Sequence, residues 1–121
     1  MPGVEGYVDD QGQAIIEIAV GGSRGEISLN AIVDTGFSGD VSLPTSTAVQ
    51  LGLELCGSEI FELADGSRVE GLVFVGQLRL GNEAREAEIV LSNSQEALVG
   101  TGLLRGRRLE IDFQSKRLIL G

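Results

Sequence analysis

Short segments of alternating apolar and polar residues, separated by glycine-containing turns, constrain this chain more than any other feature. Ile16, Ile18 and Val20 recur at every second position within residues 14–20, and residues 26–33 alternate in the same way. A period of two places the apolar side chains on one face of a β-strand. Short strands in close succession are typical of a β-sandwich or a small β-barrel, so we expect an all-β fold.

Turn signals divide the rest of the chain into similar pieces. Asp65-Gly66 and Gly81-Asn82 are hairpin-turn dipeptides between apolar runs. Residues 45–51 predict a short helix, with hydroxyl residues to cap its start and Gly52 to end it. Further strands are expected at residues 41–43, 60–63, 69–75 continued by 77–80, 87–91, 109–113 and 117–120, with a short turn or helix at residues 98–104. We see no repeat and no linker in the 121 residues, which predicts a single domain over residues 1–121.

The rarest residue types exclude several kinds of chemistry. The chain contains no histidine, which rules out a Ser-His-Asp triad and a histidine-ligated zinc ion. The single cysteine, Cys56, cannot form an internal disulfide and lacks the usual base of a cysteine nucleophile. Lys116, the only lysine, lies in a polar turn. Any hydrolytic chemistry would therefore use carboxylates, this lysine or a metal ion held by oxygen ligands, and the polar turn makes Lys116 a poor candidate. We expect no metal and no cofactor.

The net charge of −9 also limits the partners of this chain. An acidic surface disfavours binding to nucleic acid and to anionic lipid, and its simplest role is solubility. No apolar run is long enough to cross a bilayer, and the N-terminus lacks a charged-then-apolar leader. We therefore expect a cytoplasmic protein with neither a nucleic-acid nor a membrane partner.

The strongest chemical signal is the run Ala31-Ile32-Val33-Asp34-Thr35-Gly36. It places Asp34 where an apolar strand ends, with a hydroxyl and a glycine directly after it. Gly36 allows a tight turn whose backbone N–H groups can hold the carboxylate, and Thr35 can bond across to a neighbour. The tripeptide alone fits two interpretations, a catalytic carboxylate or an aspartate that caps a turn.

Two further motifs follow in the sequence. The segment 61–69 predicts a hairpin with a polar tip, and Leu98-Val99-Gly100 is an apolar pair that leads into a glycine. Gly100, Gly102 and Gly106 also give a GxGxxxG spacing, which suggests dinucleotide binding. We reject that interpretation, because a dinucleotide-binding unit needs a full helix, a second strand and an acidic ribose partner, and too little chain remains.

In this order the three motifs resemble the retropepsin-like (clan AA) aspartic peptidases. The resemblance covers residues from about 14 to the end, and Asp-Thr-Gly-Phe-Ser-Gly followed by Leu43-Pro44 resembles the small prokaryotic members in particular. It implies a small closed acid-protease-like barrel with a mid-chain flap hairpin and one or two short helices. It also implies an aspartic endopeptidase that acts on peptide or protein substrates.

The resemblance assigns roles to single residues. Asp34 would be the catalytic carboxylate, Thr35 would link two subunits beneath the site, and Gly36 would line it. Ala64, Asp65 and Gly66 would form the tip of a substrate-binding flap. Phe37 occupies the position directly after the glycine, where relatives usually have a small residue, and Ser38 follows it. Ser38 is a candidate for hydrogen bonding to the Asp34 carboxylate, and Phe37 is a candidate for shaping the neighbouring substrate pocket.

The mechanism of such peptidases needs two carboxylates, one ionised and one protonated, whereas this chain has one Asp-Thr-Gly. A two-fold homodimer would supply the second, because it places residue 34 against residue 34. The closing hairpin, residues 109–120, is either the dimer interface or a simple edge hairpin. The main alternative is a catalytically inert dimeric module that holds a peptide on the same fold.

Other acidic residues receive simpler interpretations. Asp40 and Asp65 are expected to be solvated turn residues. Asp9-Asp10-Gln11-Gly12 approaches a calcium-binding loop but lacks the regular oxygen ligands and the terminal glutamate. We expect this segment to be a polar turn that precedes the first strand.

Overall fold

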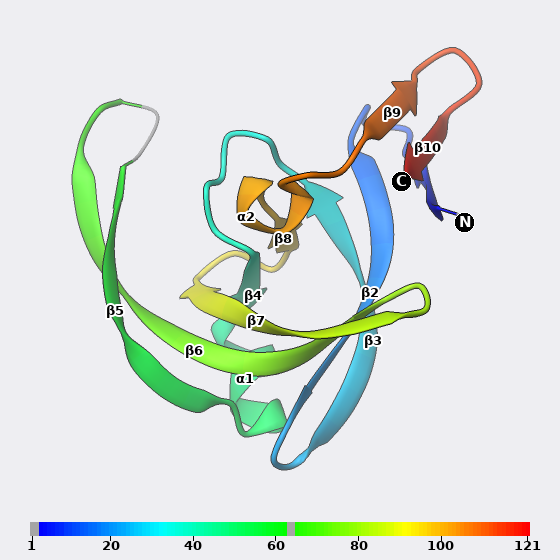
Figure 1. Cartoon of the computed structure of the whole chain (residues 1–121). Coiled ribbons are helices and arrows are strands. Elements are labelled where there is room, and N and C mark those ends of the chain that lie inside the picture. The colour runs from blue at the N-terminus through cyan, green and yellow to red at the C-terminus, as the bar shows by residue number, and fades with distance from the viewer. Residues whose placement is uncertain (1–2, 63–64) are drawn as a thin grey trace.

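A computed structural model describes residues 3–62 and 65–121 of the chain. Strands dominate the described residues, and two short helices interrupt them (Figure 1). The elements are β1 (Val4–Val8), β2 (Ala14–Gly22), β3 (Gly25–Val33), β4 (Val41–Pro44), α1 (Thr45–Leu51), β5 (Glu54–Glu62), β6 (Arg68–Leu80), β7 (Glu83–Ser92), β8 (Ala97–Val99), α2 (Thr101–Leu104), β9 (Leu109–Asp112) and β10 (Arg117–Leu120).

Six of these strands close into a barrel. The hydrogen-bonded order runs β6-β7-β4-β8-β3-β2, and an additional pairing of β2 with β6 completes the ring. In that pairing Val20 lies opposite Leu78. Strand β5 extends the sheet from β6, while β1, β10 and β9 extend it from β2. The expected all-β fold with a small closed barrel and short helices is therefore confirmed.

Alternation of side chains accounts for the barrel interior. Ile16, Ile18 and Val20 of β2 are at most 1% exposed, as the period of two predicted. Val41 and Leu43 of β4 are completely buried in the same cluster. Aliphatic side chains fill the interior because a narrow barrel leaves room for side chains only. Burial of this apolar surface is the main stabilising contribution to the fold.

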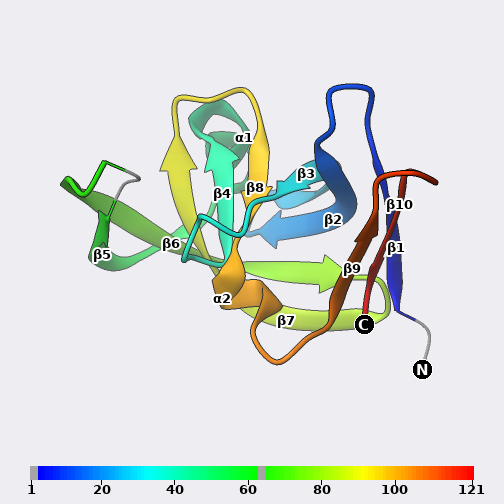
Figure 2. The same ribbon diagram turned by 90° about the horizontal axis from the view of Figure 1, so that it is seen from above.

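The mid-chain hairpin and the closing hairpin form as expected. Strands β5 and β6 pair antiparallel, with Phe61 opposite Val69, and the hairpin projects from the barrel toward the side where β3 connects to β4 (Figure 1). Strands β9 and β10 also pair antiparallel. Strand β10 in turn pairs with β1, so that β9 is the last strand of the sheet order (Figure 2).

One local prediction was wrong near the N-terminus, the position of a polar turn relative to the first strand. Asp9-Asp10-Gln11-Gly12 does form a polar turn, but it connects β1 to β2 and does not precede the first strand. The Asp9 carboxylate accepts the N–H groups of Gln11 and Gln13 at 3.0 and 2.9 Å, so it stabilises the turn. Strand β1 escaped prediction because its longest pairing is with β10, more than a hundred residues away.

The start of helix α1 also differs from the expectation. Pro44 occupies the N-cap position, and no side chain caps the helix there. The Thr45 hydroxyl instead donates to the Ser92 carbonyl at 3.1 Å, which ties the helix start to the end of β7. The predicted end is confirmed, since Gly52 adopts a left-handed φ of 67° directly after the helix.

Within the part of the chain that the structure describes, no helix is long and apolar enough to cross a membrane.

Candidate active site

Asp34 follows the last residue of β3 and is held there by the neighbouring strand. Its backbone N–H donates to the Val99 carbonyl of β8 at 2.9 Å. Strands β3 and β8 run parallel, with Val33 in register with Val99. The first motif, which ends in Asp-Thr-Gly, and the Leu98-Val99-Gly100 motif therefore lie side by side although they are far apart in the sequence.

The turn after Asp34 fixes its carboxylate. The Gly36 N–H donates to Asp34 Oδ1 at 2.9 Å, and the Phe37 N–H donates to the Asp34 carbonyl at 3.1 Å. This is the backbone support that the sequence predicted. An aspartate that merely caps a turn would form the same bonds. The surroundings of Asp34 must therefore distinguish the two interpretations.

The Leu98-Val99-Gly100 motif and the residue after it hold the loop that carries Asp34 in place. The Thr101 N–H donates to the Phe37 carbonyl at 2.8 Å, and the Gly100 N–H donates to the Asp40 carbonyl at 3.0 Å. A Cβ atom at Gly100 would lie 2.3 Å from the Gly39 carbonyl oxygen, closer than real Cβ atoms approach. The glycine here thus permits close backbone packing, which gives it a role other than phosphate binding.

Asp40 corrects one prediction, because it is not a solvated turn residue. Its side chain is 16% exposed. The carboxylate accepts the Glu88 N–H of β7 at 3.0 Å, and the Arg85 guanidinium lies 3.8 Å away. Asp40 therefore fastens the end of the Asp34 loop to β7. The sequence did not reveal this role, because the partner is a backbone group 48 residues away.

A groove of about 550 Å³ lies between the Asp34 loop and the stem of the mid-chain hairpin. Asp34 lies at the edge of this largely apolar groove, in addition to capping the turn that follows it. The residues that line it are Asp34, Gly36, Phe37, Ser38, Ser42, Phe61, Glu62, Val69, Glu70, Gly71, Val90, Leu91, Ser92 and Leu98.

The predicted site residues divide into two groups. Asp34, Gly36, Phe37 and Ser38 line the groove together. Thr35 is exposed beside them and is not part of the lining. Among the described residues, the Asp34 carboxylate accepts one hydrogen bond, from the backbone N–H of Gly36, so Ser38 does not donate to it.

The hairpin tip is the second group. Asp65 and Gly66 form the turn but do not line the groove, and Ala64 lies outside the described residues. Asp65 is the solvated turn residue that the sequence predicted: it accepts the N–H of Ser67 at 2.9 Å and its hydroxyl at 2.5 Å. These bonds, led by the hydroxyl, lower the pKa of the Asp65 carboxyl. The stem residues Phe61, Val69 and Gly71 contribute to the groove instead.

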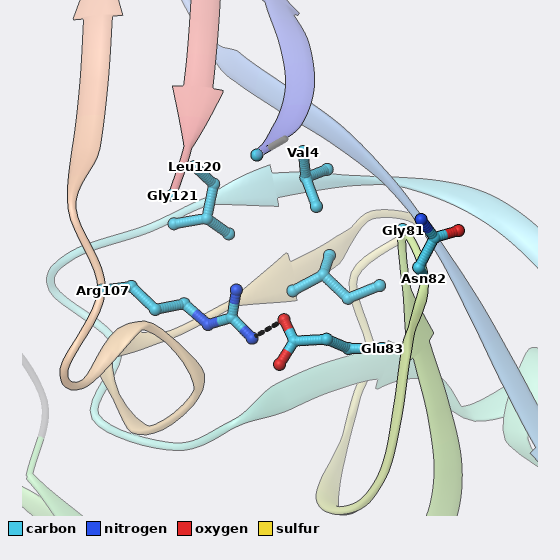
Figure 3. A pocket seen from close by; sticks show the side chains of 9 residues that line it. Val4, Gly81, Asn82, Glu83, Arg107, Leu120 and Gly121 are labelled. Atoms are coloured by element: carbon cyan, nitrogen blue, oxygen red, sulfur yellow. Dashed lines mark hydrogen bonds and ion pairs between the residues drawn. The ribbon is translucent and has the colours of Figure 1, made fainter. Parts of the chain in front are cut away.

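A second hollow of about 580 Å³ lies elsewhere on the molecule (Figure 3). It is bounded by Val4, the β6–β7 turn at Gly81 and the C-terminal Gly121. Arg107 and Glu83 form an ion pair at its wall, and the Arg107 side chain is 17% exposed. This hollow shares no lining residue with the groove at Asp34. The opposite charges of Arg107 and Glu83 neutralise each other there.

Among the residues that the structure describes, no group of three or more histidine, cysteine, aspartate or glutamate side chains is arranged to hold a metal ion. The chemistry that the groove offers is that of a fixed carboxylate at the edge of an apolar hollow.

Comparisons with known proteins identify the fold and the family of this chain. The crystal structure of a retropepsin-like aspartic protease from Rickettsia conorii matches the fold with a TM-score of 0.70 and 20% sequence identity. The match covers 97% of this chain and 88% of that one, so the fold is retropepsin-like. No curated protein matches the sequence. A sequence model of the family described as aspartyl protease matches residues 16–106, a span that includes Asp34, the hairpin and Gly100. The chain therefore belongs to the aspartyl protease family.

Proposed function

We propose that this chain is an aspartic endopeptidase that acts as a homodimer, with residues 1–121 as one peptidase domain. Two Asp34 carboxylates, one from each subunit, would activate a shared water molecule. The observation that carries this proposal is the position of Asp34. It lies on a turn fixed by backbone bonds, at the edge of an apolar groove of about 550 Å³.

The need for two subunits follows from the chemistry. The ionised carboxylate takes a proton from water, while the protonated one hydrogen-bonds to the scissile carbonyl and donates to it. One Asp34 cannot perform both tasks at once, and the chain contains a single Asp-Thr-Gly. Two like charges a few ångströms apart cannot both ionise freely, so the pair would share one proton.

The exposed residues near Asp34 support a two-fold arrangement. Thr35 and Gly36 are exposed in the single chain, directly beside the carboxylate. A polar hydroxyl at that place can meet its own counterpart across an isologous interface. Strand β9, the last strand of the sheet order, offers a second contact region, because an edge strand can pair with another chain.

The substrate of the proposed enzyme is an extended peptide segment. It would lie between Asp34 and the stem of the β5–β6 hairpin, held partly by backbone hydrogen bonds as in strand addition. Phe37, Phe61, Val69 and Leu98 line the groove and favour apolar side chains next to the scissile bond. The proposal requires no cofactor, and a cytoplasmic location stays a prediction.

The experiment that tests the proposal is cleavage of a mixed peptide library at mildly acidic pH by the wild type and by Asp34→Asn. We expect cleavage with a bell-shaped pH profile for the wild type and no cleavage for the variant. Equal thermal unfolding and equal solution mass of the two proteins would exclude a folding defect. Wild-type turnover in Asp34→Asn would refute the role of Asp34. Peptide binding without cleavage by the wild type would identify the inert binding module instead.

A further inference from the structure

Ser42 is the only polar side chain among the described residues that is buried, with 6% of its surface exposed. It lies in β4 between Val41 and Leu43, both completely buried in the barrel interior. Because successive side chains of a strand point to opposite faces, Ser42 points away from that interior. It lines the groove that also contains Asp34.

The strands on either side of β4 continue the same surface. Ser42 is in register with Val90 of β7 and with Leu98 of β8, and both of these residues line the groove. Residues in register on neighbouring strands present their side chains on the same face of the sheet. The groove therefore has a floor of three adjacent side chains, Val90, Ser42 and Leu98, with one hydroxyl between two apolar groups.

The Ser42 hydroxyl has no partner among the described residues. Hydroxyl groups that do form hydrogen bonds there belong to Ser23, Thr45, Ser67, Ser92, Ser94 and Thr101. No fully buried side-chain polar atom of the described residues is left without a partner. The Ser42 Oγ atom thus keeps contact with the space of the groove and is free to bond to a molecule that enters it.

We infer that Ser42 is a specificity-determining residue that selects a small hydrogen-bonding side chain, such as threonine, at one position of a peptide substrate. This inference rests on the proposed peptidase function. A substrate side chain that points into the groove reaches the floor before the peptide backbone does. A small side chain with a hydroxyl group fits there. Its apolar part can contact Val90 and Leu98, while its hydroxyl forms one hydrogen bond with the Ser42 hydroxyl.

Threonine and valine give a direct test, because they have nearly the same shape and differ in the hydroxyl group. The experiment uses peptide pairs with threonine or valine at each of the positions that flank the scissile bond, cleaved by the full chain. At one position we expect a ratio of kcat/KM of about ten in favour of threonine, since a hydrogen bond to an otherwise unpartnered buried hydroxyl is worth roughly that factor. Ser42→Ala should abolish this preference, so that the ratio of kcat/KM for the two peptides falls to about one.

Ser46→Ala is the matched control, because it makes the same change at an exposed position of helix α1. It should retain the wild-type preference. The inference is overturned if the wild type does not distinguish the two peptides at any position, whatever the fate of the variant. It is also overturned if Ser42→Ala keeps the threonine preference or lowers kcat/KM equally for all peptides. Absence of any cleavage by the wild type would instead refute the proposed function itself.

Discussion

Replacement of Gly100 by alanine tests whether close packing of the Leu98-Val99-Gly100 motif positions the loop that carries Asp34. Gly100 has φ −107° and ψ −178°, an extended conformation that alanine adopts without strain. Backbone freedom is therefore not the reason for glycine here. The added Cβ atom would lie 2.3 Å from the Gly39 carbonyl oxygen and 2.5 Å from the Phe37 carbonyl oxygen. Both atoms belong to the loop that follows Asp34.

The cost of this substitution can be estimated from these contacts. Overpacking of a well-packed region costs about 1–3 kcal/mol in the free energy of unfolding. Movement of the loop would also weaken the bond from the Gly100 N–H to the Asp40 carbonyl, worth about 1 kcal/mol. We expect Gly100→Ala to lose about 2–4 kcal/mol of stability. Because a displacement of 1 Å near a reacting group can cost roughly a hundredfold in rate, cleavage should fall by a similar factor.

Urea unfolding and kcat/KM at one fixed protein concentration would measure both effects. Gly57→Ala is the control, because a Cβ atom at Gly57 in β5 would meet nothing within 4 Å. That variant should unfold within about 0.5 kcal/mol of the wild type. The reasoning is refuted if Gly100→Ala matches Gly57→Ala in both stability and turnover.

Two further predictions concern charged residues behind the groove. Asp40→Ala should cost about 0.5–1.5 kcal/mol in urea unfolding, because it removes the acceptor of the Glu88 N–H. Asp40→Asn keeps an acceptor and should cost less, and equal losses would contradict the role of this bond. The pKa of the Glu88 carboxyl is raised, first by desolvation and then by the Glu59 and Asp40 carboxylates. A folded-state pKa above the unfolded one means that stability falls as the pH rises through that raised pKa. Glu88→Gln should therefore raise the unfolding temperature at pH 7 more than at pH 4, and an equal change at both pH values would count against this account.

Local patterns predicted much of the fold. The period of two in β2 and β3 identified the buried faces, and the Asp65-Gly66 turn located the mid-chain hairpin correctly. Closure of the barrel depends on the pairing between β2 and β6. This pairing brings together residues nearly sixty positions apart, such as Val20 and Leu78. No local pattern specifies such a contact. The start of β5 was also missed, because it is exposed and contains a bulge between Leu55 and Gly57.

The candidate site was predictable where a sequence motif determines a turn. Asp34 and Gly36 form their predicted bond because they are only two positions apart in the sequence. Asp40 and Ser42 could not be placed in the same way, since their surroundings come from β7 and β8. One signal for Ser42 was present in the sequence: a lone hydroxyl between two apolar residues in a short strand must face away from their side of the sheet.

A subunit-mixing experiment tests the central claim, that two Asp34 carboxylates from two chains form one active site, most directly. A fixed amount of wild type would be incubated with increasing Asp34→Asn until the subunits have exchanged, and cleavage would then be measured. If each site needs both carboxylates, equal amounts of the two chains leave about one quarter of the dimers intact, and activity falls to roughly half. Further excess of the variant should lower it further. Activity that stays constant at every ratio would show that one chain suffices, and would contradict the shared site.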